Sequence, residues 1–152
     1  MHNLLILDGA MGTMLQAAGM KAGEHPEVFG FDNPEIVKNI HLKYIESGSN
    51  VIYTNTFGAN AHKLEGCKID VDTAVKTAIK SAKEAIDESK RDVKVALDIG
   101  PIGELLEPLG VLRFEDAYEI YKEMVVAGEK YGADIIIFET FTDLYDVRAG
   151  VL

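Results

Sequence analysis

The sequence predicts an α/β fold in which short parallel strands alternate with amphipathic helices. Four short runs are mostly apolar without alternation, as expected of strands covered on both faces. These runs are Leu4–Leu7, Asn50–Tyr53, Val93–Leu97 and Asp134–Phe138. Segments with helical periodicity separate them, so the order is β-α-β-α-β-α-β-α, which is typical of a parallel sheet with right-handed crossovers.

Each segment between and after these runs has an apolar stripe on one helical face. The predicted helices are Pro34–Ser47, Asp72–Lys90, Phe114–Tyr131 and Asp143–Leu152. The first of them is expected to take Asn33 as its N-cap and to begin with proline, which is favoured at the first helical position. By contrast, the segment Met20–Asp32 contains two glycines and a proline, and we expect it to be a long loop.

Composition excludes several classes of partner. The chain of 152 residues carries 15 basic and 25 acidic residues, a formal net charge of −10. This balance repels nucleic acid and anionic membranes, so neither is expected as a partner. The single cysteine, Cys67, excludes an internal disulfide framework and is typical of a reducing cytoplasm. No run approaches the roughly 20 apolar residues of a membrane span, so we expect a cytoplasmic protein.

Polar side chains end each of the four predicted strands. They are Asp8, then Thr54 with Asn55, then Asp98, and finally Glu139 with Thr140. Taken singly, each is better explained as a turn or cap residue than as part of a site. Together, at the edge where α/β proteins bind ligands, the four polar strand ends indicate a binding site.

Two architectures accommodate this order of elements. One is an open, flavodoxin-like sheet, which the chain length favours. The other is the first half, four βα units, of a (β/α)8 TIM barrel, whose full length is about 250 residues. The polar strand ends favour the half-barrel, because in a barrel all of them converge on one mouth.

The residues at the first strand end suit a zwitterionic ligand. Gly9 and Gly12 surround a turn whose backbone N–H groups can face an anion, although the pattern is not a phosphate-binding Walker loop. The carboxylates of Asp8 and Glu139 suit an ammonium group. A free amino acid carries both charges and is the ligand class that we expect.

Four segments then carry a resemblance to a known family. "LLILDGAMGTMLQ", "YTNTFGAN", "ALDIGPIGELLEP" and "FETFTDL" resemble, in order and spacing, segments of the homocysteine S-methyltransferase family. The resemblance covers essentially the whole chain. Within the family, the third segment looks most like the N-terminal homocysteine-binding domain of cobalamin-dependent methionine synthase.

The resemblance implies a (β/α)8 barrel that binds homocysteine and holds zinc at its mouth, with cobalamin and methyltetrahydrofolate serving the full-length protein. It implies that Asp8 and Glu139 orient the amino acid, and that Asn55 and Thr56 shape the pocket beneath it. The strand ends and the resemblance together predict one set of substrate-binding residues, with no catalytic residue or metal ligand assigned. The set is Asp8, Gly9, Ala10, Asn55, Thr56, Asp98, Glu139 and Thr140.

The zinc ligands of the family are three cysteines on later strands, and Cys67 matches none of those positions. We therefore expect residues 1–152 to be the N-terminal half of the barrel, truncated after its fourth strand, and inactive in isolation. Its expected partners are homocysteine, the remaining half of the barrel in the same or another chain, and a second copy of itself. The alternatives are a non-catalytic half-barrel interaction module and an open-sheet binder of small molecules.

Overall fold

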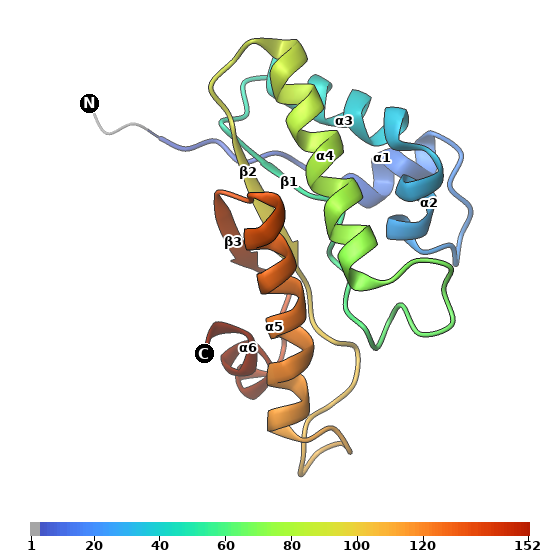
Figure 1. Cartoon of the computed structure of the whole chain (residues 1–152), viewed down its shortest axis with the longest axis vertical. Helices are drawn as coiled ribbons and strands as arrows, with labels where there is room; N and C mark the ends of the chain where they lie inside the picture. The colour runs from blue at the N-terminus through green and yellow to red at the C-terminus, as the bar shows by residue number, and fades with distance from the viewer. Residues whose placement is uncertain (1–3) are drawn as a thin grey trace.

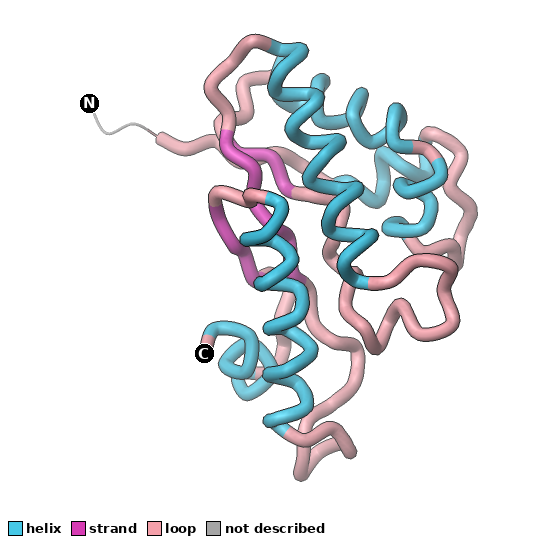
Figure 2. Tube along the Cα trace, in the orientation of Figure 1, coloured by secondary structure: helices cyan, strands magenta, loops and turns pink. Residues whose placement is uncertain are grey.

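The computed structural model describes residues 4–152, which form three short strands and six helices (Figure 1). In chain order the elements are α1 (Met11–Ala17), α2 (Pro26–Asp32), α3 (Pro34–Glu46), β1 (Val51–Tyr53), α4 (Val71–Ser89), β2 (Lys94–Ile99), α5 (Phe114–Tyr131), β3 (Ile135–Phe138) and α6 (Leu144–Val151). Figure 2 shows the short strands near the middle of the molecule and long loops after β1 and β2. None of the described helices has the length and hydropathy to cross a membrane.

The three strands form one parallel sheet in the order β1-β2-β3. Tyr53 of β1 lies beside Ala96 of β2, and Ile99 of β2 lies beside Phe138 of β3. This confirms the predicted parallel α/β order. In a flavodoxin-like sheet, the first predicted strand, Leu4–Leu7, would lie between the second and the third, which are β1 and β2 here. The structure pairs β1 directly with β2, which contradicts that alternative.

The predicted strand Leu4–Leu7 is wrong as a full strand. Leu7 alone forms a parallel bridge, to Val51, and the Ile6 carbonyl accepts from the backbone N–H groups of Asn50 and Val51. The segment therefore runs beside β1 in the expected place. Its side chains are 48% to 84% exposed, so little apolar burial is available to hold a regular edge strand.

The main core lies between the sheet and the helices α4 and α5, which cover one side of it (Figure 1). From the strands, Ile52, Leu97 and Ile99 enter this core and are fully buried. Alternate residues of a strand point to opposite faces, so the residues between them face away from α4 and α5. That second face carries the candidate site.

A helix replaces the loop predicted over Met20–Asp32. The helix α2 begins with a proline at its first position, where the missing backbone N–H costs nothing. Val28 packs against the main core, and Phe29 packs against a smaller cluster between α1 and α3. Seven residues are too short for a helix to be stable alone, so these tertiary contacts decide its formation.

The four predicted helices, which are α3, α4, α5 and α6 of the structure, are confirmed to within one residue at each end. The side chain of Asp70 caps α4 by accepting from the Thr73 N–H group, and that of Asp143 caps α6. Asn33 occupies the N-cap position of α3 as predicted, but its side chain donates back to the Phe29 carbonyl of α2. Asn33 lies between α2 and α3, and its side chain hydrogen-bonds to the C-terminal end of α2 instead of capping α3.

Candidate functional site

Three carboxylates meet on the sheet face that α4 and α5 leave free. Asp98 is in register with Ile137, and Glu139 is two residues further along the same face. Asp8 reaches the next strand, because its Oδ2 accepts a hydrogen bond of 2.9 Å from the Tyr53 N–H group. Glu139 raises the pKa of both aspartates by charge repulsion, so the three groups share one electrostatic environment.

Asp98 is the most perturbed of the three. The sequence places it after its strand, whereas the structure places it inside β2, which ends at Ile99. Its side chain is buried, and its Oδ1 has no hydrogen-bond partner among the described residues. Burial, followed by the charges of Glu139, Asp8 and Glu27, raises its pKa to about 8. A carboxyl group in this state holds a proton at neutral pH.

The pKa of Asp8 is raised less than that of Asp98, because the Asp8 carboxylate accepts a hydrogen bond from the Tyr53 N–H group. Burial raises its pKa to about 6, and the hydrogen bond from the Tyr53 N–H group opposes that rise. The phenol of Tyr53 belongs to the same environment: burial, then Glu139, Asp8 and Asp98, raise its pKa. The site therefore combines three acidic groups with one aromatic hydroxyl, a set suited to a ligand with a cationic end.

The threonines after β1 support the site from beneath. The Thr56 hydroxyl donates to the Asp98 carbonyl at 2.7 Å, and the Asp98 N–H group donates to the Thr54 hydroxyl at 3.1 Å. The two hydroxyls are 2.6 Å apart. Because the proton of Thr56 is engaged with Asp98, Thr54 is the donor between them. This buried chain of hydrogen bonds fixes the end of β1 against Asp98.

Asn55 does not join the carboxylates. Its side-chain amide donates to the Pro26 carbonyl at 2.7 Å, at the start of α2. A Cβ at Gly30 would lie only 2.6 Å from the same amide nitrogen, so the glycine leaves room for it. In this structure Asn55 holds α2 against the end of β1, and the prediction that it shapes the pocket stays a prediction.

Gly9 and Ala10 are held by an aromatic side chain of α3. The Tyr44 hydroxyl donates to the Ala10 carbonyl at 3.0 Å. A Cβ at Gly9 would lie 2.9 Å from the same hydroxyl oxygen, so a larger residue here would require the Tyr44 side chain to shift. Thr140 is exposed and has a φ of 63°, an unusual backbone conformation for a β-branched residue. That bend directly follows Glu139 and begins the loop beyond β3.

Sequence reasoning missed three residues around the site: Tyr53, Glu27 and Lys63. Glu27 is buried on α2, and its Oε1 accepts from the Gly58 N–H group at 2.6 Å. The Lys63 ammonium donates to the Pro101 carbonyl at 2.8 Å and lies 5.2 Å from the Phe57 ring centroid. Tyr53 could have been found from its position at the strand end. Glu27 and Lys63 lie in segments whose local sequence carries no signal for a site.

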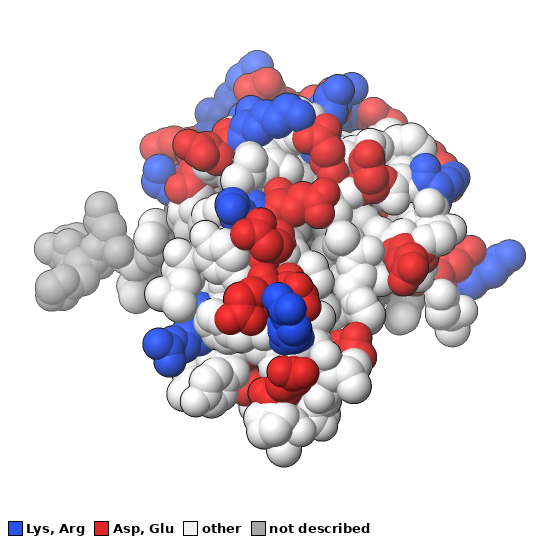
Figure 3. Space-filling model, turned by 60° about the horizontal axis from the view of Figure 1, so that its bottom comes forward, with Lys and Arg blue, Asp and Glu red and all other residues white. Residues whose placement is uncertain are grey.

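Acidic side chains are spread over the face of the molecule drawn in Figure 3, with fewer basic ones between them. Burial raises the pKa values of both Glu27 and Asp146, and the charge of His25 opposes the rise at Glu27. The charge of Lys63 opposes the rise at both acids. It does not act in this way on Asp98. The described groups whose charges act on Asp98 are all acidic.

Comparison with known proteins gives the family. The family model for homocysteine S-methyltransferases matches residues 5–152, almost the whole chain. The chain belongs to the homocysteine S-methyltransferase family. Curated relatives include the methionine synthase of Mycobacterium tuberculosis, 29% identical over 162 residues, and that of Mycobacterium leprae, 32% identical over 166 residues. The alignments cover 99% of this chain but only 14% and 13% of those proteins.

Solved structures of this family show the same fold. The metallated form of the homocysteine methyltransferase MmuM from Escherichia coli matches with a TM-score of 0.82 and 23% sequence identity. The match covers 96% of this chain and 57% of the MmuM chain. The oxidized form matches equally well, over 56% of its chain. The likeness shows that this homocysteine S-methyltransferase segment shares the arrangement of strands and helices found in MmuM.

The zinc that the family resemblance implies does not fit the side chains of residues 4–152. Within that range no three His, Cys, Asp or Glu side chains are grouped so as to hold a metal ion. Cys67 is half-buried in the loop between β1 and α4. A structural or catalytic zinc site needs at least three protein ligands, so no step below is derived through a metal.

Proposed function

We propose that this chain provides the homocysteine-binding part of a methyltransferase that forms methionine. The observation that carries the proposal is the cluster of Asp8, Asp98 and Glu139 on one sheet face at the strand ends. An α-amino acid presents an ammonium group with three N–H donors, which matches a group of carboxylate acceptors. Membership in the homocysteine S-methyltransferase family supports homocysteine as that amino acid.

In the proposed reaction the chain orients its substrate. The Asp8 and Glu139 carboxylates hold the ammonium, while the threonines after β1 keep Asp98 in place. The thiolate sulfur of homocysteine then forms a bond to the methyl carbon as the bond from that carbon to its donor breaks. Fixing the amino acid end restricts the positions open to the sulfur, which lowers the entropic cost of reaching the donor.

We propose further that residues 1–152 are the first four βα units of a (β/α)8 barrel. The sequential parallel order and the structural likeness to MmuM support this architecture. The outer edge of β3 is unpaired in the described chain, and Ile136 there is 41% exposed. A closed barrel leaves no strand edge, so the proposal predicts a further strand beside β3.

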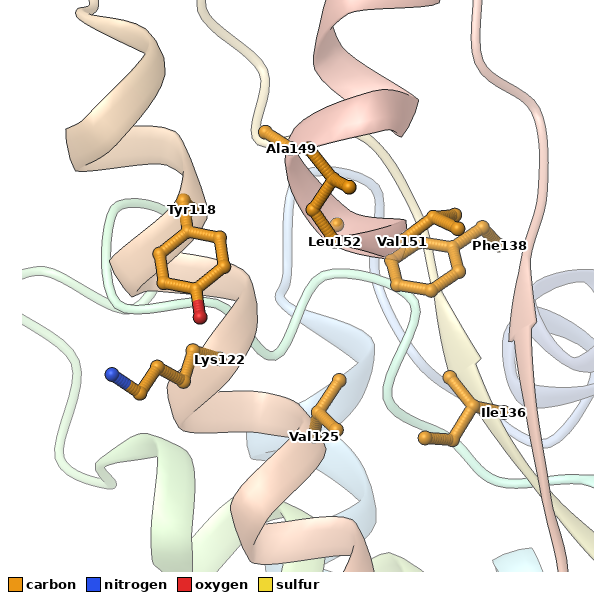
Figure 4. Close-up of a pocket in the computed structure, with 9 residues that line it drawn as sticks. Tyr118, Lys122, Val125, Ile136, Phe138, Ala149, Val151 and Leu152 are labelled. Carbon is orange, nitrogen blue, oxygen red and sulfur yellow. The ribbon is translucent and has the colours of Figure 1, made fainter.

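A hollow beside β3 fits this proposal. It has a volume of about 440 Å³ and lies between α5, β3 and α6. Figure 4 shows Tyr118 and Val125 of α5 on one side of it, and Ile136 and Phe138 of β3 on the other. We propose that the other half of the barrel, in the same or another chain, covers this largely apolar surface, and that a second copy does so when this chain is alone.

For the whole protein, the similarity to methionine synthases supports cobalamin and methyltetrahydrofolate as the source of the methyl group, with zinc bound elsewhere in the domain. We place its action in the cytoplasm, in line with a single cysteine and no disulfide framework.

The test is homocysteine binding by the complete domain. Asp8→Asn and Glu139→Gln should each weaken binding by about 1.5–3 kcal/mol, the value of a hydrogen bond to a charged group. Zinc content should stay unchanged in both. The exposed residues Asp87 on α4 and Glu129 on α5 offer matched controls, and Asp87→Asn and Glu129→Gln should bind like the wild type. Unchanged affinity in both site variants would remove these carboxylates from the site.

A further inference from the structure

The Asp98 carboxyl has no positively charged partner among the described residues. It is 8% exposed, and its Oδ1 has no hydrogen-bond partner among the described residues. The charged groups that act on it come from every side: Asp8 before α1, Glu27 on α2 and Glu139 after β3. The Tyr53 phenol of β1 shares this environment. All three charged groups are acidic.

The ammonium of Lys63, which acts on other buried acids, is engaged elsewhere. The Lys63 ammonium donates to the Pro101 carbonyl, and its stem passes over Gly58 and Gly103, where added Cβ atoms would lie 3.4 and 3.0 Å from it. Its charge acts on Glu27 and Asp146. Several carboxylates in a low-dielectric site cannot all ionise unless a cation or a proton neutralises them.

We propose that Asp98 holds a proton in the empty site and that the ammonium of an amino-acid ligand takes the place of this proton. Binding then releases one proton: the Asp98 carboxyl becomes a carboxylate, and the proton goes to solvent. The inference rests on the proposed amino-acid site and adds to it a role for Asp98 and a dependence of affinity on pH.

The chemistry of the two occupants supports the exchange. A proton neutralises one carboxyl but leaves Asp98 Oδ1 without a partner, whereas an ammonium offers three donors to the cluster. The positive charge of the bound ligand also lowers the pKa of Asp98 from its value of about 8 in the empty site. The ligand therefore binds most strongly to the protein in which Asp98 is ionised.

Linkage gives the sign and size of the effect. Below the pKa of Asp98 in the empty site, the ammonium must displace a proton, so affinity falls as pH falls. With that pKa at about 8, affinity should rise about five- to tenfold between pH 7 and pH 8.5. Below pH 6, protonation of Asp8 weakens binding further, since the pKa of Asp8 is about 6.

The experiment is calorimetric titration of the complete domain with L-methionine, which has the ammonium but no thiol proton that could confuse the count. Titrations in two buffers with different heats of ionisation measure the protons released. At pH 7 we expect close to one proton per ligand in the wild type and in the control Asp87→Asn. An analogue without the amino group, 4-(methylthio)butanoate, should release none.

Asp98→Asn is the decisive variant. Its methionine affinity should change less than twofold between pH 7 and pH 8.5, with no proton release. Carbon NMR provides a second measurement that needs no ligand: one aspartate carboxyl of the wild type should titrate near pH 8, and its signal should be absent from the variant. If no aspartate titrates above pH 6.5, the proposal is wrong.

Two other outcomes separate the inference from the proposed function. Methionine binding without proton release would overturn the exchange and leave the amino-acid site standing. No methionine binding at any pH from 6 to 9 would overturn both, since the exchange needs an ammonium in this site.

Discussion

Asp98 shows how a single buried carboxyl can make the stability of a fold depend on pH. Its carboxyl is buried beside two other acids, with one oxygen unpartnered within the described chain. Ionising it in the folded chain is unfavourable, which is why its pKa rises from 3.8 to about 8. The folded state therefore binds more protons than the unfolded state between these values, and stability falls as pH rises through this interval.

Replacing Asp98 by asparagine should stabilise the chain at alkaline pH. At pH 8.5 the variant avoids a buried carboxylate, and we expect its free energy of unfolding to exceed that of the wild type by roughly 1–3 kcal/mol. At pH 4 both side chains are neutral in the folded state, so the difference should nearly vanish. Urea denaturation at the two pH values measures both, with Asp87→Asn as the control. Equal stabilities at pH 8.5 would contradict the burial of a charged Asp98.

At the scale of elements, α2 is tied to the loop after β1 by two buried contacts. Glu27 accepts from the Gly58 N–H group, and Asn55 donates to the Pro26 carbonyl. Burial raises the pKa of Glu27, while the Gly58 hydrogen bond and the Lys63 charge oppose the rise. The short helix and the loop that carries Thr56 thus support one another.

Glu27→Ala should destabilise both α2 and the loop after β1. It leaves the buried Gly58 N–H group without an acceptor, which should cost about 1–3 kcal/mol in stability. Hydrogen exchange should accelerate over α2 and residues 56–60. Glu27→Gln keeps an acceptor oxygen of the same shape and is the matched control, with stability close to the wild type. Equal exchange rates in all three proteins would show that this contact does not hold the helix.

At the scale of the whole molecule, the described sheet has an unpaired edge at β3, and only a short irregular segment runs beside β1 at the other edge. Leu7 alone of the first segment pairs with β1, and Ile136 marks the unpaired edge of β3. The exposed residues of the first segment are apolar, as is much of the hollow beside β3 (Figure 4). Exposed edges of this kind pair with other chains.

We expect the isolated chain to self-associate through these edges. Light scattering should give a mass of about twice the 16.6 kDa of one chain, or more, against the repulsion of a net charge of −10. Ile136→Lys puts a charge at the β3 edge and should shift the chain toward the monomer. Val126→Lys changes an exposed residue of α5 outside the hollow and should not. A wild-type monomer at high concentration that binds no apolar dye would refute the edge pairing.

The isolated chain should form no methionine. An alkyl thiol is mostly protonated at neutral pH, and the described residues include no group of three metal-ligating side chains that could activate the sulfur of homocysteine. Metal analysis and a methionine assay of the chain, alone and mixed with a second barrel half, measure this. Activity is expected only in the mixture or in the complete domain. Turnover by the chain alone would place sulfur activation within these residues.

The sequence by itself determined the order of elements and the chemistry at the strand ends. Apolar runs and helical stripes are local patterns, so β1, β2, β3 and the long helices could be predicted from them. Asp8, Asp98 and Glu139 could be predicted as neighbours, because parallel strands bring their carboxyl ends to one edge. The family resemblance implied roles for two of these residues, Asp8 and Glu139.

Only the tertiary structure decided what depends on distant partners. The segment Leu4–Leu7 is an apolar run by pattern, yet without a neighbour on its outer side it forms one bridge to β1. The helix α2 exists because Gly58 and Asn55, some thirty residues away, hold it. The state of Asp98 depends on burial and on three other acids brought together by folding. A pKa is a property of the surroundings in space, and local sequence does not contain them.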